Sequence, residues 1–213
     1  VFLSSSKIFL FSKTPYPGVN HIPVLQATYL QPSIDFSVYD YIIATSKEVF
    51  TALDKIGSWK DLPVLAISDA TAEAAEEIGA KVLDIAQGYG GDIVRLVREK
   101  YADLKALYPH AKILAYDIET ALSQSGVSVD SFVVYETSCM HSIAIELPED
   151  AVCIFTSPSS IKCFEKLYGF LPDYKIVCIG ETTRSALPEG VDAIVSEKTS
   201  VASCVQRAES LAV

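Results

Sequence analysis

Hydroxyl side chains gather at four places where the sequence predicts that a strand runs into a helix. Two of these turns are Thr45-Ser46 and Thr156-Ser157, and the other two lie at residues 68–71 and 180–183. In an open parallel sheet, ligands bind beyond the carboxyl ends of the strands, where helix N-termini direct free N–H groups outward. Hydroxyls beside such groups suit carboxylates, although each Ser or Thr could instead only cap its helix.

The two turns in the second half of the chain, Thr156-Ser157 and residues 180–183, have the fuller set of capping and hydroxyl groups. Ser157-Pro158 is typical of a helix start, with Ser as N-cap and Pro at the first helical position. We therefore expect this pair to carry more of the binding, and if the two halves of the chain face each other, all four turns line one cleft. The candidate substrate-binding residues are Ser46, Ser68, Thr71, Thr156, Ser157, Gly180, Thr182 and Thr183.

Conventional catalytic motifs are absent from the sequence. It has no G-x-S-x-G elbow, no P-loop and no H-E-x-x-H. The glycine run at 88–91 lacks the G-x-G-x-x-G order, so we interpret it as a plain loop into a helix. The three histidines, His21, His110 and His141, have no metal-ligand spacing, and no metal site is expected.

The cysteines are odd in number and contain no C-x-x-C pair, which favours reduced, buried thiols that pack as small apolar residues. They are Cys139, Cys153, Cys163, Cys178 and Cys204.

Composition indicates a globular chain. It has 213 residues, 50% of them hydrophobic and 21% charged, which allows one or two domains with cores of their own. A net charge of −10 argues against nucleic acid as a partner. No apolar run is long enough to span a membrane, so we expect a soluble, cytoplasmic protein.

Short apolar runs alternate with segments of helical period, which is typical of parallel strands joined by helices. The predicted strands are 7–12, 39–44, 63–67, 81–85, 112–115, 151–155, 175–179 and 193–195. The predicted helices are 47–56, 70–78, 92–101, 158–168, 182–186 and 201–211.

One α/β segment occurs twice in the chain. The Thr45-Ser46 and Thr71 positions have counterparts at Thr156-Ser157 and Thr183 at nearly the same distance along the chain, and Gly79 and Gly190 close the following helices. Two extended connectors lie on either side of the first copy. The sequence therefore predicts an α/β fold of two similar domains with parallel sheets flanked by helices: a discontinuous domain 1 (1–21 and 147–213), a two-stranded β linker (22–34 and 131–146), and an inserted domain 2 (35–130).

The order and spacing of these turns resemble the uroporphyrinogen-III synthase family from Lys7 to Leu211. The motifs are Thr156-Ser157-Pro158, the Ile-Gly-x-Thr-Thr turn at 179–183, their weaker counterparts at 45–46 and 67–71, and Val134-Tyr135-Glu136-Thr137 in the second connector. The resemblance implies the same two-domain fold.

The resemblance also implies an activity. Family members are hydro-lyases of tetrapyrrole (porphyrin, heme) biosynthesis that close hydroxymethylbilane to uroporphyrinogen III, with inversion of ring D through a spiro intermediate and loss of water, by positioning the substrate in an inter-domain cleft. No cofactor or metal is implied. Tyr135 matches the family's linker tyrosine, which would hydrogen-bond or protonate the departing hydroxyl. A monomer is expected, and the upstream enzyme that makes hydroxymethylbilane is a candidate partner.

One departure from the family is that residues 13–20 are too short for the helix that usually follows the first strand, so one sheet face could be exposed. Two other functions compete with the synthase. A non-catalytic two-lobed binding protein for a small anion would use the same turns. A nucleotide-linked α/β enzyme would use the glycine run.

Overall fold

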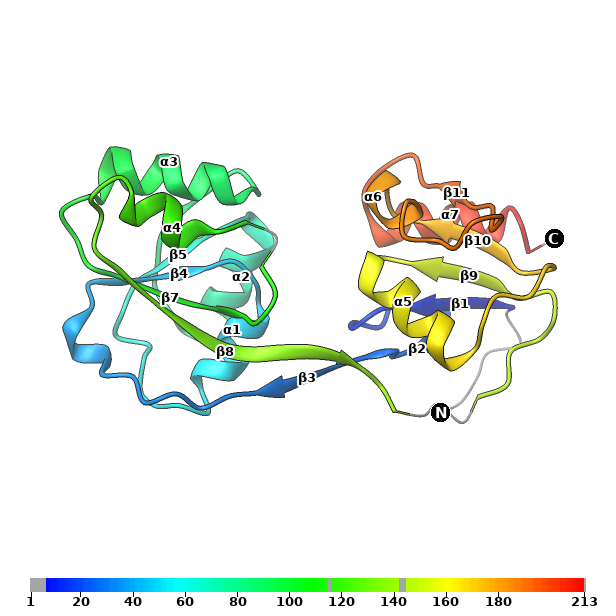
Figure 1. Cartoon of the computed structure of the whole chain (residues 1–213), viewed down its shortest axis with the longest axis horizontal. Helices are drawn as coiled ribbons and strands as arrows, with labels where there is room; N and C mark the ends of the chain where they lie inside the picture. The colour runs from blue at the N-terminus through cyan, green and yellow to red at the C-terminus, as the bar shows by residue number, and fades with distance from the viewer. Residues whose placement is uncertain (1–6, 115, 142–144, 213) are drawn as a thin grey trace. The chain divides into compact units, whose positions relative to one another are not determined.

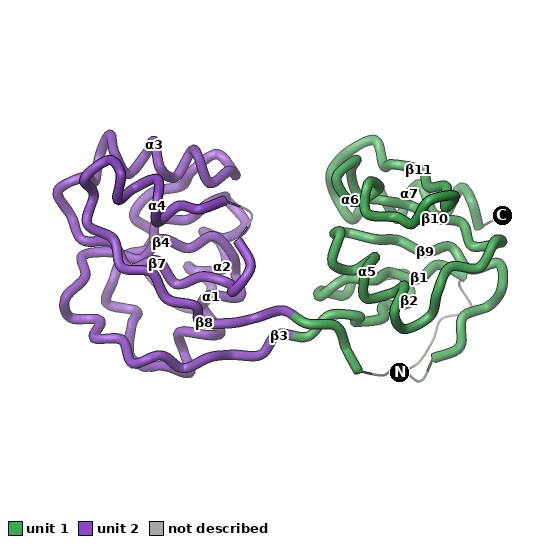
Figure 2. The backbone as a smooth tube through the Cα atoms, in the orientation of Figure 1, with its two compact units in different colours: residues 1–26, 138–213 green, residues 27–137 purple. Residues whose placement is uncertain are grey.

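The computed structural model describes residues 7–114, 116–141 and 145–212 (Figure 1). The chain divides into two compact units (Figure 2). The discontinuous unit comprises residues up to Gln26 and from Ser138 onward, and the inserted unit comprises Ala27–Thr137. Both boundaries fall inside the segments predicted to link the domains.

The inserted unit contains most of a six-stranded sheet of order β3-β8-β7-β4-β5-β6. The strands are β3 (Leu25–Tyr29), β4 (Tyr41–Ala44), β5 (Val64–Ala66), β6 (Val82–Ile85), β7 (Ala106–Ala111) and β8 (Val129–Cys139). The strands from β8 to β6 run parallel. β3 runs antiparallel to β8, since the Leu30 N–H bonds the Val134 carbonyl at 2.8 Å and the Met140 N–H bonds the Val24 carbonyl at 2.9 Å.

Helices cover both faces of this sheet because alternate residues of its buried strands point to opposite sides. In β4, Ile42 and Ala44 pack against α1 (Glu48–Leu53) and α2 (Asp69–Glu77). Tyr41 and Ile43 pack on the other side, against α3 (Gly90–Lys100) and α4 (Ile118–Ser123). A short 3-10 helix, η1 (Phe36–Val38), precedes β4.

The discontinuous unit contains a five-stranded parallel sheet of order β11-β10-β9-β1-β2. Its strands are β1 (Ile8–Phe11), β2 (Asn20–Ile22), β9 (Val152–Phe155), β10 (Lys175–Cys178) and β11 (Ile194–Val195). Its helices are α5 (Pro158–Leu167), α6 (Glu181–Arg184) and α7 (Val201–Glu209).

The predicted repeat is confirmed by the order of the elements along the chain and by which strands are neighbours in each sheet. The series β4-α1-β5-α2-β6-α3 corresponds to β9-α5-β10-α6-β11-α7, and in both sheets the three strands lie side by side. Gly79 and Gly190 close α2 and the segment after α6 with φ of +80° and +82°, a conformation that favours glycine. The predicted α/β fold of two similar domains, one inserted in the other, is therefore correct.

One strand prediction was wrong. Residues 112–114 are exposed, and the strand is Ala106–Ala111 instead, followed by the unpredicted helix α4. Pro109 obscured this strand, because proline cannot donate a hydrogen bond to a neighbouring strand. It is tolerated because β7 pairs with β4 only at Ala106 and Leu107, before the proline.

The expected exposed sheet face was also wrong. No helix lies between β1 and β2 among the described residues, as the sequence predicted. Tyr16 and Val19 of the intervening loop nevertheless pack with α7 against Ile8 and Leu10, which are 5% and 0% exposed. A loop with two large side chains thus covers the surface that a helix would cover.

The expectation of reduced thiols fails for two cysteines. Cys139, at the end of β8, and Cys163, in α5, form a disulfide with a Cα–Cα distance of 5.1 Å. Cys153, Cys178 and Cys204 are free and buried, as predicted. Sequence spacing could not predict the pair, because only tertiary packing places these two cysteines side by side.

No described helix is long and apolar enough to span a membrane. The described His, Cys, Asp and Glu side chains form no group of three that could hold a metal ion.

Candidate functional site

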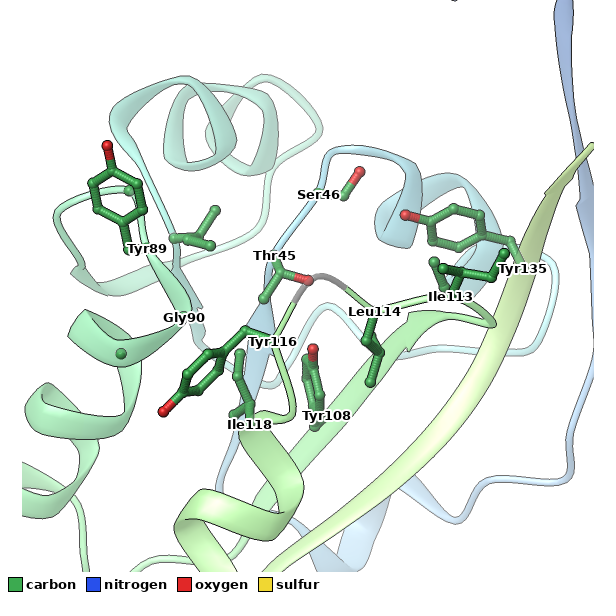
Figure 3. A pocket seen from close by; sticks show the side chains of 14 residues that line it. Thr45, Ser46, Tyr89, Gly90, Tyr108, Ile113, Leu114, Tyr116, Ile118 and Tyr135 are labelled. Atoms are coloured by element: carbon green, nitrogen blue, oxygen red, sulfur yellow. The ribbon is translucent and has the colours of Figure 1, made fainter. Parts of the chain in front are cut away.

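A cavity of about 580 Å³ lies in the inserted unit, beyond the carboxyl ends of β4, β5 and β7 (Figure 3). This edge is where an open parallel sheet binds ligands, because the loops that leave the strands diverge there. The Thr45-Ser46 turn after β4 lines the cavity, and Tyr135 of β8 reaches it. The predicted catalytic residue and one predicted binding residue, Ser46, are therefore neighbours.

Each residue of the Thr45-Ser46 turn shares the cavity wall with a tyrosine. Thr45 lies near Tyr108 of β7 and Ser46 lies near Tyr135 of β8, and each hydroxyl acts to lower the pKa of its tyrosine (Figure 3). The rings of Tyr108 and Tyr135 are buried, with exposed fractions of 1% and 6%. The strand order β8-β7-β4 brings these side chains to one turn.

The surroundings of Tyr135 keep its phenol protonated near neutral pH. Burial raises its pKa, because a phenolate loses hydration there. The hydrogen bond with Ser46 acts in the opposite direction, while the Glu48 carboxylate raises the pKa further. The net shift is upward, so the phenol of Tyr135 stays protonated at neutral pH.

Glu48, the first residue of α1, connects this turn to β3. Its carboxylate accepts a short hydrogen bond from the Tyr29 hydroxyl. Burial and this carboxylate together raise the pKa of Tyr29 to about 12. The backbone N–H of Glu48 donates to Ser46 Oγ at 3.3 Å. The Ser46 hydroxyl is thereby held at the start of α1.

The remainder of the cavity wall is apolar or made of glycine. None of the described residues that line it is charged. Ile67, Ile113, Leu114 and Ile118 contribute aliphatic surface, and Tyr89 and Tyr116 contribute aromatic surface. Such a wall suits an apolar ring with a few oriented hydroxyls, and it offers no cation to an anionic group.

The glycine run at 88–91 forms part of the cavity wall, whereas the sequence had indicated only a plain loop into a helix. Gly88, Gly90 and Gly91 line the cavity, and α3 begins at Gly90. A methyl group at Gly90 would lie 2.6 Å from Cδ1 of Tyr116 and 2.9 Å from its Cβ. Glycine is therefore required for Tyr116 to pack against the start of α3. The signal in the sequence was the glycine run itself.

Ser68 and Thr71 lie at the start of α2, and neither lines the cavity. Ser68 is the N-cap residue, and its Oγ lies 3.3 Å from Oγ1 of Thr71. Thr71 is 4% exposed. The two hydroxyls thus bond each other, although the neighbouring Ile67 does line the cavity.

The remaining predicted binding residues lie in the discontinuous unit. Ser157 forms a capping box with Ser160 at the start of α5, with Pro158 in the first turn. Gly180 is the N-cap residue of α6, Thr182 is exposed, and Thr183 is 3% exposed. Thr156 is half-buried after β9. Thr183 is thus buried like its counterpart Thr71.

Sequence reasoning missed three residues that shape the cavity. Tyr108 lies in the strand whose position was predicted wrongly, and Tyr116 follows it in a segment without clear periodicity. Thr45 was noted as part of the repeated turn but not as a neighbour of Tyr108 at the cavity.

Comparison with known proteins agrees on one family. The family model described as "Uroporphyrinogen-III synthase HemD" matches residues 15–206. A search of curated proteins gives no match. The chain is similar to the crystal structure of uroporphyrinogen-III synthetase from Helicobacter pylori, with 25% identity, a TM-score of 0.82, and coverage of 97% of this chain and 99% of that one. A mutant uroporphyrinogen III synthase from the extremely thermophilic bacterium Thermus thermophilus shares the fold, with 17% identity, a TM-score of 0.54, and coverage of 91% and 90%.

Proposed function

This chain belongs to the uroporphyrinogen-III synthase family, which closes hydroxymethylbilane to uroporphyrinogen III, and we propose that its Tyr135 is the proton donor of the reaction. The enzyme is a cyclising lyase of heme biosynthesis, and its substrate is a small linear tetrapyrrole. The observation that carries the proposal is the buried, protonated phenol of Tyr135 at an uncharged cavity.

The first chemical step is loss of the hydroxyl group from ring A. The carbon–oxygen bond breaks with both electrons on oxygen, and the Tyr135 proton converts the leaving group to water. Electrons from the pyrrole nitrogen form the azafulvene, and the N–H proton of that ring then restores the phenol. The azafulvene carbon is attacked by the substituted carbon of ring D, which gives the spiro intermediate before ring D inverts.

The cavity wall supports the binding of a pyrrole ring rather than a carboxylate. Its aliphatic and aromatic side chains gain from burial of a ring, whereas a carboxylate would lose hydration without a cation in exchange. We assign the acetate and propionate groups instead to backbone N–H and hydroxyl groups at helix starts. The proposed binding residues remain Ser46, Ser68, Thr71, Thr156, Ser157, Gly180, Thr182 and Thr183.

The proposal for Tyr135 is tested by Tyr135→Phe with hydroxymethylbilane as substrate. The products are oxidised, and the type I and type III porphyrin isomers are separated. We expect kcat to fall by at least about tenfold, because general acid catalysis typically contributes that much or more. Tyr174→Phe, which removes a phenol hydroxyl in the discontinuous unit, is the matched control and should keep wild-type turnover.

Two outcomes would contradict the proposals separately. Unchanged turnover in a folded Tyr135→Phe variant would leave Tyr135 with only a packing role. If the wild-type protein yields only the type I isomer, as hydroxymethylbilane does on its own, the chain lacks synthase activity.

We also propose that the enzyme acts as a cytoplasmic monomer and receives hydroxymethylbilane from the enzyme that makes it. For the domains we propose the division 1–21 with 147–213, a linker of 22–34 with 131–146, and an inserted domain of 35–130. Sedimentation equilibrium tests the monomer, and cell fractionation tests the location.

A further inference from the structure

The two most exposed large apolar side chains of the described residues line the same cavity. Ile113 is 83% exposed and Tyr89 is 77% exposed, whereas every other large apolar side chain in the described part of the chain is at most 48% exposed. Tyr89 lies on the side of α3, and Ile113 lies on the side of β8 (Figure 3). Apolar side chains that gather in contact with water around a hollow are typical of a ligand-binding groove.

Backbone hydrogen bonds hold both residues in place although their side chains are exposed. The Tyr89 carbonyl accepts the Asp92 N–H at 3.0 Å, in the first turn of α3. Immediately before Ile113, the Lys112 N–H donates to the Tyr135 carbonyl at 2.9 Å, which fastens this loop to β8. The two side chains therefore stand at fixed points of the cavity wall, so a ligand between them meets a surface that is already formed.

Cyclisation of the bilane has two competing outcomes at ring D. The free α-carbon of ring D can attack the azafulvene carbon and lose its proton, which gives the type I isomer. The α-carbon that carries the bridge to ring C can attack instead, which gives the spiro intermediate. The bridge bond then breaks and re-forms at the free α-carbon, which loses its proton, and the type III isomer results. The orientation of ring D beside the azafulvene therefore selects the isomer.

We propose that Tyr89 and Ile113 are specificity-determining residues: their side chains contact the pyrrole rings in the cavity and restrain ring D, so that attack by its bridge-bearing carbon prevails. A pyrrole ring removes the apolar surface of both residues from water, which favours its binding between them. The inference rests on the proposed binding of a pyrrole ring at this cavity, and it is independent of which group donates the proton.

An interface with a second copy of this chain makes a different prediction. In that case the two side chains pack against the other copy, and their removal changes the association of the chains but not the isomer formed. The cavity favours the substrate, because its volume of about 580 Å³ is typical of a pocket for a small molecule.

The test uses Tyr89→Ala and Ile113→Ala with hydroxymethylbilane at increasing enzyme concentration. Type I porphyrin that arises in free solution disappears once the enzyme captures all of the substrate, whereas type I porphyrin that arises on the enzyme remains. We expect the remaining ratio of type I to type III to rise at least about fivefold in each variant, as suits the loss of an apolar contact from one of two competing transition states. Tyr89→Phe and Ile113→Val keep the apolar surface and should stay close to wild type.

Val38→Ala is the matched control, because Val38 is an exposed aliphatic residue of the same unit that does not line the cavity. Urea midpoints should stay near wild type, since both side chains are mostly exposed in the folded protein. An unchanged isomer ratio in both alanine variants would overturn the proposal, and a change in sedimentation alongside it would assign the surface to a second copy. If the wild type yields only the type I isomer, the proposed function fails instead, so the two failures are distinguishable.

Discussion

The tyrosines of the inserted unit differ in role because their partners differ. Tyr135 and Tyr108 meet the hydroxyls of the Thr45-Ser46 turn, beside a cavity. Tyr39 donates instead to the Asp130 carboxylate at 2.9 Å and belongs to the core beneath the sheet. The Asp130 carboxylate engages the phenol proton of Tyr39, so we do not expect Tyr39 to take part in the chemistry at the cavity.

We expect Asp130 to contribute to the stability of the folded protein. Its carboxylate bonds the Lys105 ammonium at 2.8 Å as well as Tyr39, and these contacts, Lys105 foremost, lower its pKa. A group whose pKa is lower in the folded state stabilises the protein above its unfolded pKa, about 4, and loses that contribution as the pH falls through the folded value. We expect Asp130→Asn to lower the urea midpoint at pH 7 and to approach wild type below about pH 4.

Asp103→Asn, at an exposed loop position, is the control for this measurement. An equal difference between wild type and Asp130→Asn at pH 7 and at about pH 3 would show that the charge of Asp130 contributes nothing.

Among the elements, the two copies of the repeat use their first turn differently. Ser157 caps α5 with its own side chain, and the capping box occupies that hydroxyl. In the first copy α1 begins one residue later relative to the turn, and Lys47 is the N-cap residue without a side-chain cap. Ser46 accepts the Glu48 N–H at 3.3 Å and lines the cavity together with Tyr135. Because α1 starts one residue later than α5 relative to the turn, Ser46 lies beside the proposed catalytic Tyr135, whereas Ser157 caps its own helix.

Gly90 at the start of α3 provides a prediction about the cavity wall. In Gly90→Ala the new methyl group meets the Cβ and ring of Tyr116, so Tyr116 must move. Because Tyr116 lines the cavity, we expect KM for hydroxymethylbilane to rise several-fold. Alanine also favours helices by about 1 kcal/mol over glycine, so stability should not fall in parallel.

Gly91→Ala is the comparison, since no atom lies within 4 Å of the position its methyl group would take. It should change KM less than Gly90→Ala does. Equal effects of the two substitutions would show that the contact with Tyr116 does not shape the binding site.

At the scale of the whole molecule, the chain leaves the discontinuous unit once, forms the inserted unit, and returns through β8. The return is fastened by the Cys139–Cys163 disulfide, which ties the end of β8 to α5 inside the discontinuous unit. The two cysteines are separated by 24 residues, and a cross-link over such a loop restricts the unfolded chain.

We expect Cys139→Ser with Cys163→Ser to lower the free energy of unfolding by about 3 kcal/mol, from the loop-closure entropy. A reductant should destabilise the wild type by a similar amount and leave the double variant unchanged. Thiol titration of the unfolded, non-reduced protein should find three free thiols. Five free thiols would contradict the disulfide. In that case the free energy of unfolding of the wild type should equal that of the double variant and should not change on addition of a reductant.

The sequence by itself determined the repeated α/β order, the insertion of one domain in the other and the positions of the turns. These features depend on local periodicity and on residues such as Ser157-Pro158 and Gly79, whose effects act within a few positions of the chain. The strand at 106–111 escaped prediction because Pro109 is tolerated only where β4 no longer pairs with β7.

Only the tertiary structure decided which side chains meet. Ser46 and Tyr135, Gly90 and Tyr116, and Cys139 and Cys163 are pairs from distant segments. The strand order β8-β7-β4 joins the first pair, and packing of α3 and of α5 joins the others. Local patterns indicate that a residue lies in a turn or faces a core, but the order of strands in a sheet arises from packing of the whole chain. That is why Ser46 and Tyr135 could each be predicted as site residues while their proximity could not.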